Sequence, residues 1–253
     1  MSLSEFALLS VVFFATSVVS VITGATSLVT VPVLLSMGIE PRIALATNML
    51  ALTFLSTGAA VPFLVGGEVE RRGLPLLLTL TVAGSLAGLL VFAVPENFIR
   101  LIVCIAMLSV GITVLRQTRD TEIIRTGRAR RLTGYVVTLL LAVYGGFFSG
   151  GYVTMLTAAW TTLFGMSFRH AVATTKIANL FSSLTAVVIF AARDAIDWQL
   201  GVILSAAAFL GALVGARWTL LLSEMWLRRV FVAVVFILAL KTLVFDVRWS
   251  AIL

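Results

Sequence analysis

Lys176 is the residue whose type and position most clearly indicate chemistry. It lies about eight residues into an apolar run that begins near Phe168, which at about 1.5 Å of rise per residue places it roughly 12 Å deep in a spanning helix. A lysine at the centre of a membrane costs about 2.5–3.5 kcal/mol on insertion scales. A bound anion would lower that cost, so Lys176 is a candidate anion ligand. The alternative is a lysine whose long side chain reaches the membrane interface.

Two glycine-interrupted stretches bring hydroxyl groups into otherwise apolar sequence, at residues 23–32 and 149–157. A helix that begins after each glycine has first-turn amides without helical partners and the positive end of the helix dipole, which together make a backbone site for an anion. The alternative is that glycine and threonine only permit close helix packing. The candidate substrate-binding residues at these breaks are Thr23, Gly24, Thr26, Ser27, Gly150, Gly151, Tyr152 and Thr154.

The segments that follow the two breaks open with similar sequences, at residues 44–49 and 171–176. Asn48 and Asn179 offer amide donors, and Lys176 and Asn179 share a helix face because they are three residues apart. The candidates in these segments are Thr47, Asn48, Thr174, Thr175, Lys176 and Asn179.

The residues that are missing narrow the chemistry further. The predicted spans contain no aspartate or glutamate apart from Glu5 at the very start of the first, which argues against a carboxylate proton relay. The chain has one cysteine, Cys104, and one histidine, His170, so it offers no metal-ligand cluster, and we expect neither a metal nor another cofactor. A site with a cation and hydroxyls but no carboxylate suits a small oxyanion better than a metal ion or an amine.

Two other functional classes stay open. An anion channel would conduct without saturating at low substrate, whereas a carrier saturates. An intramembrane serine protease would use Ser149, within a glycine-rich turn, and His170 as a nucleophile and base. His170 lies at the end of an element whereas Ser149 lies near the break, which argues against the protease. We therefore assign no catalytic residue and do not expect an enzyme.

Composition places the chain in a membrane. Hydrophobic residues make up 60% and charged residues 11%, against about 45–50% and about 25% in soluble domains. The net charge of +7 is carried in short loops between apolar runs, so it does not indicate nucleic-acid binding. The expected partners are the lipid bilayer and a small anionic substrate, with no nucleic acid, and a homodimer is left open.

The chain repeats itself at a shift of 127 residues. This shift pairs Gly24 with Gly151 and Thr30 with Thr157, and no gap is needed as far as Gly88. We expect two homologous halves, a first repeat at 1–115 and a second at 132–253, joined by a basic cytoplasmic connector at 116–131.

Two topologies compete for these halves. If residues 5–37 form one bent span, the repeats are parallel. If residues 5–37 fold back at Gly24 as a hairpin, each half is a glycine-broken hairpin followed by three spanning helices, and the repeats are inverted. The positive-inside rule favours the hairpin, because it places most loop arginines on the side of the connector and both termini outside. The predicted fold is therefore an all-α integral membrane protein with two inverted repeats.

The doubled pattern resembles the sulfite exporter TauE/SafE family, within the toluene-sulfonate uptake permeases. The resemblance covers essentially the whole chain and rests on four matching features: the stretch from Gly24 to Pro32, the loop at 37–41 before 44–48, the pair Gly150 and Gly151, and residues 164–166 before 171–179. The second copy departs by carrying Ala159 where the first has Pro32, and Tyr152 beside its glycine. The resemblance implies transport of sulfite, sulfoacetate or another organosulfonate across the bacterial inner membrane.

Overall fold

The computed structural model describes residues 3–90, 127–147 and 149–241, and these residues form α-helices joined by short connections. The predicted helix at 97–115 and most of the connector lie outside this part of the chain. The described helices are α1 (Leu3–Thr23), α2 (Ser27–Ser36), α3 (Pro41–Val65), α4 (Leu74–Leu90), α6 (Arg128–Phe147), α7 (Tyr152–Leu163), α8 (Phe168–Ala191), α9 (Trp198–Leu221) and α10 (Glu224–Lys241).

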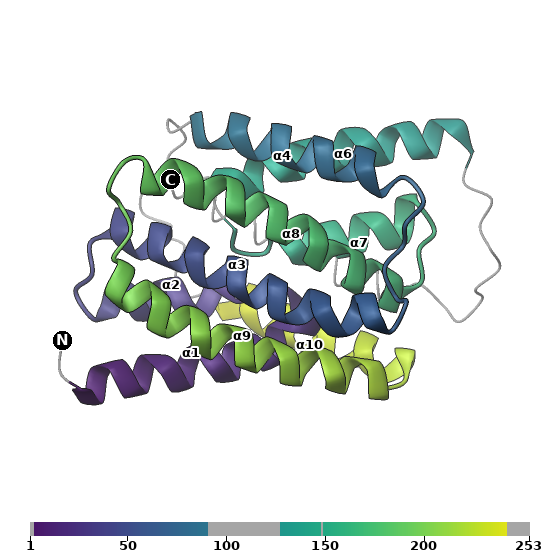
Figure 1. Cartoon of the computed structure of the whole chain (residues 1–253). Coiled ribbons are helices and arrows are strands. Elements are labelled where there is room, and N and C mark those ends of the chain that lie inside the picture. The colour runs from purple at the N-terminus through teal and green to yellow at the C-terminus, as the bar shows by residue number, and fades with distance from the viewer. Residues whose placement is uncertain (1–2, 91–126, 148, 242–253) are drawn as a thin grey trace.

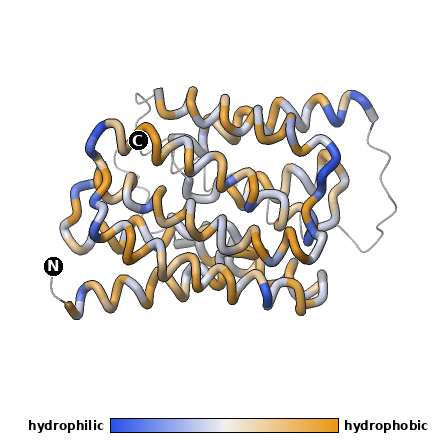
Figure 2. Tube along the Cα trace, viewed as in Figure 1, coloured by the Kyte–Doolittle hydropathy of each residue, from blue (hydrophilic) through white to orange (hydrophobic). Residues whose placement is uncertain are grey.

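Four of the described helices, α1, α3, α8 and α9, are long and apolar enough to cross a membrane. Figure 2 shows hydrophobic residues along the helices and hydrophilic residues gathered toward the two ends of the bundle. Large apolar side chains such as Val188, Leu210 and Trp218 point outward, as expected where lipid replaces water as the solvent. The predicted all-helical membrane protein is confirmed for the described residues.

The short helices α2 and α7 begin at the predicted glycine breaks. Gly24 and Gly151 both have a positive φ, of 72° and 79°, a backbone region that residues with a Cβ enter only at a cost. The chain therefore leaves the helical path after α1 and after α6, and starts a new helix at Ser27 and at Tyr152.

Figure 1 shows the directions of the helices. The start of α1 and the connection from α2 to α3 lie at one end of the bundle, together with the connection from α8 to α9. The start of α6 and the connections from α3 to α4, α7 to α8 and α9 to α10 lie at the other end. Helices α1, α3 and α9 thus run one way, and α4, α6 and α8 run the opposite way.

Glycines let helices from the two halves of the chain pack closely. A Cβ at Gly211 or Gly215 of α9 would collide with the backbone of α1 at Phe14 or Val18. On the other side of the bundle, a Cβ at Gly84 of α4 would lie 2.6 Å from Cβ of Ala142 on α6. Small residues are the usual means of close helix association in membranes.

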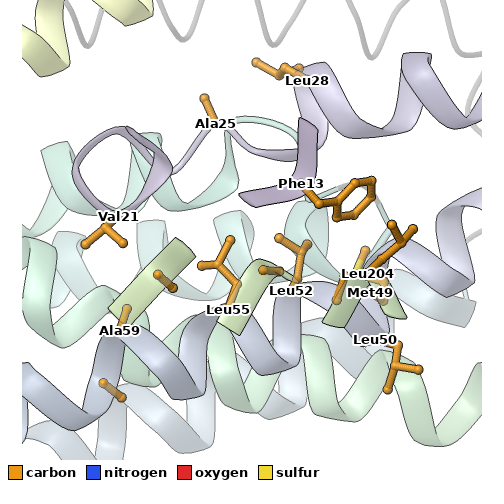
Figure 3. Close-up of a cluster of buried hydrophobic side chains, with 14 of the residues drawn as sticks. Phe13, Val21, Ala25, Leu28, Met49, Leu50, Leu52, Leu55, Ala59 and Leu204 are labelled. Atoms are coloured by element: carbon orange, nitrogen blue, oxygen red, sulfur yellow. The ribbon is translucent and has the colours of Figure 1, made fainter. Parts of the chain in front are cut away.

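An apolar cluster between α1, α3 and α9 forms the core beside the first break. Figure 3 shows Phe13, Leu52, Leu55 and Leu204 within this cluster, with Ala25 of the break above them. Leu52 and Leu55 of this cluster are almost fully buried beneath the break.

Candidate functional site

The two helix breaks contact each other directly. Thr154 Oγ1 donates a hydrogen bond of 2.6 Å to the main-chain oxygen of Thr23. A Cβ at Gly24 would lie 2.6 Å from Cβ of Val153 and 2.9 Å from the main-chain nitrogen of Thr154, so only a glycine allows the two backbones to come this close. Ser27 Oγ and Ser149 Oγ, which come from different breaks, are 2.7 Å apart and share a hydrogen bond.

A small, mostly polar pocket lies where the breaks meet. It has room for about one water molecule, so a larger guest must widen it. Its lining includes five of the predicted site residues, Gly24, Thr26, Ser27, Lys176 and Asn179, which come from the first break and from α8. The other lining residues are Ser20, Leu52, Leu55, Ser149 and Val153.

Lys176 extends into this pocket and not to the membrane interface. Its side chain is 1% exposed, and Nζ donates a hydrogen bond of 2.8 Å to the main-chain oxygen of Ser20. The same oxygen accepts from the amide of Gly24, at 2.7 Å. It belongs to the last turn of α1, where the helix dipole is negative and favours a cation.

Hydroxyl and amide groups are hydrogen-bonded in two groups beside the pocket, one at Asn48 and one at Asn179. Asn48 Nδ2 donates to Ser27 Oγ at 2.9 Å, while Asn48 Oδ1 accepts from Thr30 at 2.7 Å. On the other side of the pocket, Asn179 Nδ2 donates to Ser56 Oγ at 2.7 Å. These bonds orient the amide of Asn48 at both of its ends and the amide of Asn179 at its nitrogen.

Two further hydroxyls, of Ser20 and Thr26, line the pocket. Ser20 Oγ and Thr26 Oγ1 share a hydrogen bond across the first break. A hydroxyl that is bonded to another hydroxyl can turn and donate to an anion instead. None of the lining residues is acidic.

Thr47 and Thr174 lie outside the pocket and hold inter-helix connections. Thr47 Oγ1 accepts from the amide of Asp197, at 3.2 Å, just before α9 begins. Thr174 Oγ1 accepts from the amide of Glu70, at 2.9 Å, in the connection before α4. The sequence predicts that these two hydroxyls bind substrate. In the structure each of them instead accepts a hydrogen bond from a loop amide.

The remaining predicted site residues lie next to the pocket without lining it. Thr175 Oγ1 and Thr157 Oγ1 are 3.2 Å apart and share a hydrogen bond. The main-chain oxygen of Gly150 accepts from Tyr144 Oη at 2.6 Å. Gly151 caps the start of α7. The ring of Tyr152 packs against Gly145, where a Cβ would lie 2.6 Å from it, and its hydroxyl is buried without a hydrogen-bond partner among the described residues.

Ser149 and His170, the residues of the protease alternative, have separate partners. Ser149 Oγ bonds Ser27 at the meeting of the breaks. His170 Nε2 lies 3.4 Å from Glu68 Oε2, in a cluster with Arg169 at one end of the bundle. Within the described residues no group of histidine, cysteine, aspartate and glutamate could hold a metal ion.

Ser20 and Ser56 take part in the site but were not among the predicted residues. A signal for Ser20 is present in the sequence, because Ser20 lies four residues before Gly24, where a helix is expected to end. The last carbonyl oxygens of a helix have no helical N–H donor and are free to accept from other groups. Ser56 carries no such signal, since its role depends on the contact of α3 with α8.

These features define a class of protein. Four of the described helices are long and apolar enough to cross a membrane, and two broken helices meet at a buried polar pocket, as in secondary transporters that bind substrate between discontinuous helices. The chain belongs to the sulfite exporter TauE/SafE family, whose model matches residues 8–242.

Curated relatives are similar over almost their whole length. A "Probable membrane transporter protein" of Haemophilus influenzae is 29% identical over 245 residues, which cover 96% of each chain. The "Probable membrane transporter protein YfcA" of Escherichia coli K12 is 29% identical over 93% of this chain and 90% of its own. A Sinorhizobium protein, "Probable membrane transporter protein ORF9", is 27% identical over 94% and 92%. No solved structure matches.

The family and these relatives indicate that the chain is a multi-pass membrane transporter and not an enzyme. The predicted family is therefore confirmed.

Proposed function

We propose that the protein is a bacterial inner-membrane secondary transporter of a small sulfur oxyanion. The observation that carries the proposal is Lys176, a fully buried lysine in a polar pocket where two broken helices meet and where none of the described lining residues is acidic. An anion is the guest that such a pocket favours, because it offsets the charge of the lysine and accepts hydrogen bonds from hydroxyls and amides.

The first-turn amides of α2 and α7 would hold the oxygens of the substrate, near Thr26 and Thr154. Binding requires the contacts that close the pocket to separate, notably Ser27 with Ser149 and Ser20 with Thr26. Each hydroxyl released in this way becomes a donor to the anion, so hydrogen bonds are exchanged and not lost.

The substrate class of this proposal comes from the family, described as a sulfite exporter. Sulfite, sulfoacetate and other organosulfonates each present several oxygens that share negative charge. Export is the direction that the family's description suggests.

Alternating access in this proposal uses two inverted repeats, 1–115 and 132–253, that rock against one another. The opposite directions of α3 and α8, and of α4 and α9, support an inverted relation, because each pair is matched by the shift of 127 residues. The positive φ shared by Gly24 and Gly151, and by Gly38 and Gly165, supports a common backbone in the two halves.

The test is binding of sulfite and sulfoacetate to the purified protein, measured by calorimetry. Lys176→Met should weaken binding at least about tenfold, because it removes the buried charge while keeping similar length and apolar volume. Arg217→Met is the matched control, since Arg217 is exposed near the end of α9 and its loss should leave affinity unchanged. Equal affinity of Lys176→Met and the native protein would refute the role of the lysine.

Transport by vesicles that contain the protein separates a carrier from a channel. A carrier saturates and shows counterflow, so that unlabelled sulfoacetate inside accelerates uptake of labelled sulfoacetate from outside. Unsaturated flux without counterflow would identify the channel alternative.

A further inference from the structure

Lys176 has a charge that its surroundings balance incompletely. Its described hydrogen bond goes to a neutral main-chain oxygen, that of Ser20, although an ammonium group carries three donors. The pocket that it enters is lined by hydroxyls, one amide and apolar side chains. A buried ammonium without a carboxylate is destabilised, and there are two remedies, which are the arrival of an anion or the loss of a proton.

The other described ionisable groups do not balance the charge of Lys176. None of them lines the pocket. The tyrosines of the described residues are Tyr135 and Tyr144 on α6 and Tyr152 at the start of α7. The other ionisable residues whose side chains are described lie in or beside the first or last turns: Glu5 on α1, Glu40 and Arg42 at the start of α3, Glu68, Glu70, Arg71 and Arg72 before α4, Arg128, Arg130 and Arg131 on α6, Arg169 and His170 on α8, Arg193 and Asp194 after α8, Asp197 and Arg217 at the two ends of α9, and Arg229 on α10.

We propose that the transporter moves its anion together with one proton, and that Nζ of Lys176 carries this proton. This inference rests on the proposed function and names its coupling ion. The loaded site holds an ammonium beside an anion, so the lysine neutralises one negative charge of the guest. When the anion leaves, the N–H bond breaks, the proton passes to water on the same side, and the lysine returns as a neutral amine.

Among the described residues that line the pocket, Lys176 is the one that titrates, and none is a carboxylate. One proton therefore accompanies each anion in this scheme. The anion then moves toward the more alkaline side, and export against an alkaline cytoplasm requires that the anion has accumulated inside.

The experiment uses the full chain in proteoliposomes with radiolabelled sulfoacetate and a pH dye trapped inside. The membrane potential is held at zero with potassium and valinomycin. An interior that is more alkaline by one pH unit should accumulate sulfoacetate about tenfold, because one proton per anion transfers about 1.4 kcal/mol of gradient. The dye should report acidification of the interior when sulfoacetate is added outside.

Lys176→Arg separates proton coupling from binding. A guanidinium keeps its proton in proteins, so the variant should exchange labelled for unlabelled sulfoacetate but should lose the accumulation driven by pH. Arg217→Met is the control and should behave like the native protein in both assays.

The outcomes distinguish this inference from the proposed function. Native protein that shows counterflow but neither accumulation nor acidification would overturn proton coupling and leave the transporter standing. Accumulation retained by Lys176→Arg would also overturn the role of the lysine as proton carrier. Native protein with neither counterflow nor binding would instead overturn the proposed function. If Lys176→Arg does not fold, the dye measurement on the native protein decides alone.

Discussion

Gly24 shows how one residue can determine whether the two breaks meet. Two independent requirements coincide there, a positive φ of 72° and a backbone approach that leaves no space for a Cβ next to Val153. The second requirement is the one that concerns the site, since it places the start of α7 against the end of α1.

Gly24→Ala should therefore destabilise the protein by more than the cost of placing an alanine at a positive φ, because its Cβ would also collide with Val153. It should weaken substrate binding as well. Gly38→Ala is a matched control, because Gly38 has φ of 79° but nothing within 4 Å of its Cβ position. We expect Gly38→Ala to lower the free energy of unfolding by about 1–2 kcal/mol with binding unchanged. Thermal unfolding and sulfoacetate calorimetry on both variants check this, and equal effects would show that the contact with Val153 is unimportant.

Individual residues also show how far sequence can predict a site. Lys176 could be found because one charge in an apolar run is costly and needs a reason. Thr47 and Thr174 looked equivalent to the other hydroxyls, yet they accept from the amides of Asp197 and Glu70, and those pairings join segments distant in sequence. Local sequence reveals which groups are polar, but only the fold decides which partner each group has.

At the scale of elements, the connection from α3 to α4 is tied to the start of α8. Glu68 lies 3.5 Å from Arg169 and 3.4 Å from His170, and Arg169 also donates at 2.6 Å to the main-chain oxygen of Leu222 before α10. Three connections at one end of the bundle are thereby joined. The positions related by the 127-residue shift are Ala195, Arg42 and Ile43, which cannot form the same ion pairs.

Glu68→Gln should loosen this end of the bundle and alter the transport rate more than the affinity. These side chains are partly exposed, so the ion pairs contribute about 0.2–1 kcal/mol, which corresponds to a change in rate of about 1.5- to 5-fold. Glu40→Gln, at an exposed position of the opposite end, is the control and should leave the rate unchanged. Initial rates of counterflow measure the effect, and a change confined to affinity would contradict it.

The element boundaries followed from sequence, but the packing partners did not. Glycine breaks and apolar runs predicted short helices at 25–37 and 151–164, close to the observed α2 and α7. Nothing in a run of apolar residues indicates that α9 packs on α1, or that α4 packs on α6. Those pairings depend on which glycines face which backbone, as Gly211 and Gly84 show.

For the whole molecule, the two ends of the bundle differ in charge. One end holds the connections from α3 to α4, α7 to α8 and α9 to α10, together with the start of α6, and the other holds those from α2 to α3 and α8 to α9. The described arginines near the first end are Arg71, Arg72, Arg128, Arg130, Arg131, Arg169, Arg217 and Arg229. The described acidic residues near the first end are Glu68 and Glu70. Near the second end lie Arg42 and Arg193, together with Glu5, Glu40, Asp194 and Asp197. Cytoplasmic loops carry the excess of arginine, so the first end should face the cytoplasm.

Cysteine labelling in cells tests this orientation. In a Cys104→Ala background, which removes the single native thiol, Ser36→Cys places a thiol at the end of α2 and Ser223→Cys places one between α9 and α10. Both serines are exposed, so both variants should react once the membrane is permeabilised. A membrane-impermeant maleimide should label Ser36→Cys in cells whose inner membrane is intact and should reach Ser223→Cys only after permeabilisation. Labelling of both from the same side would contradict the inverted arrangement, because that arrangement requires the two positions to lie on opposite faces of the membrane.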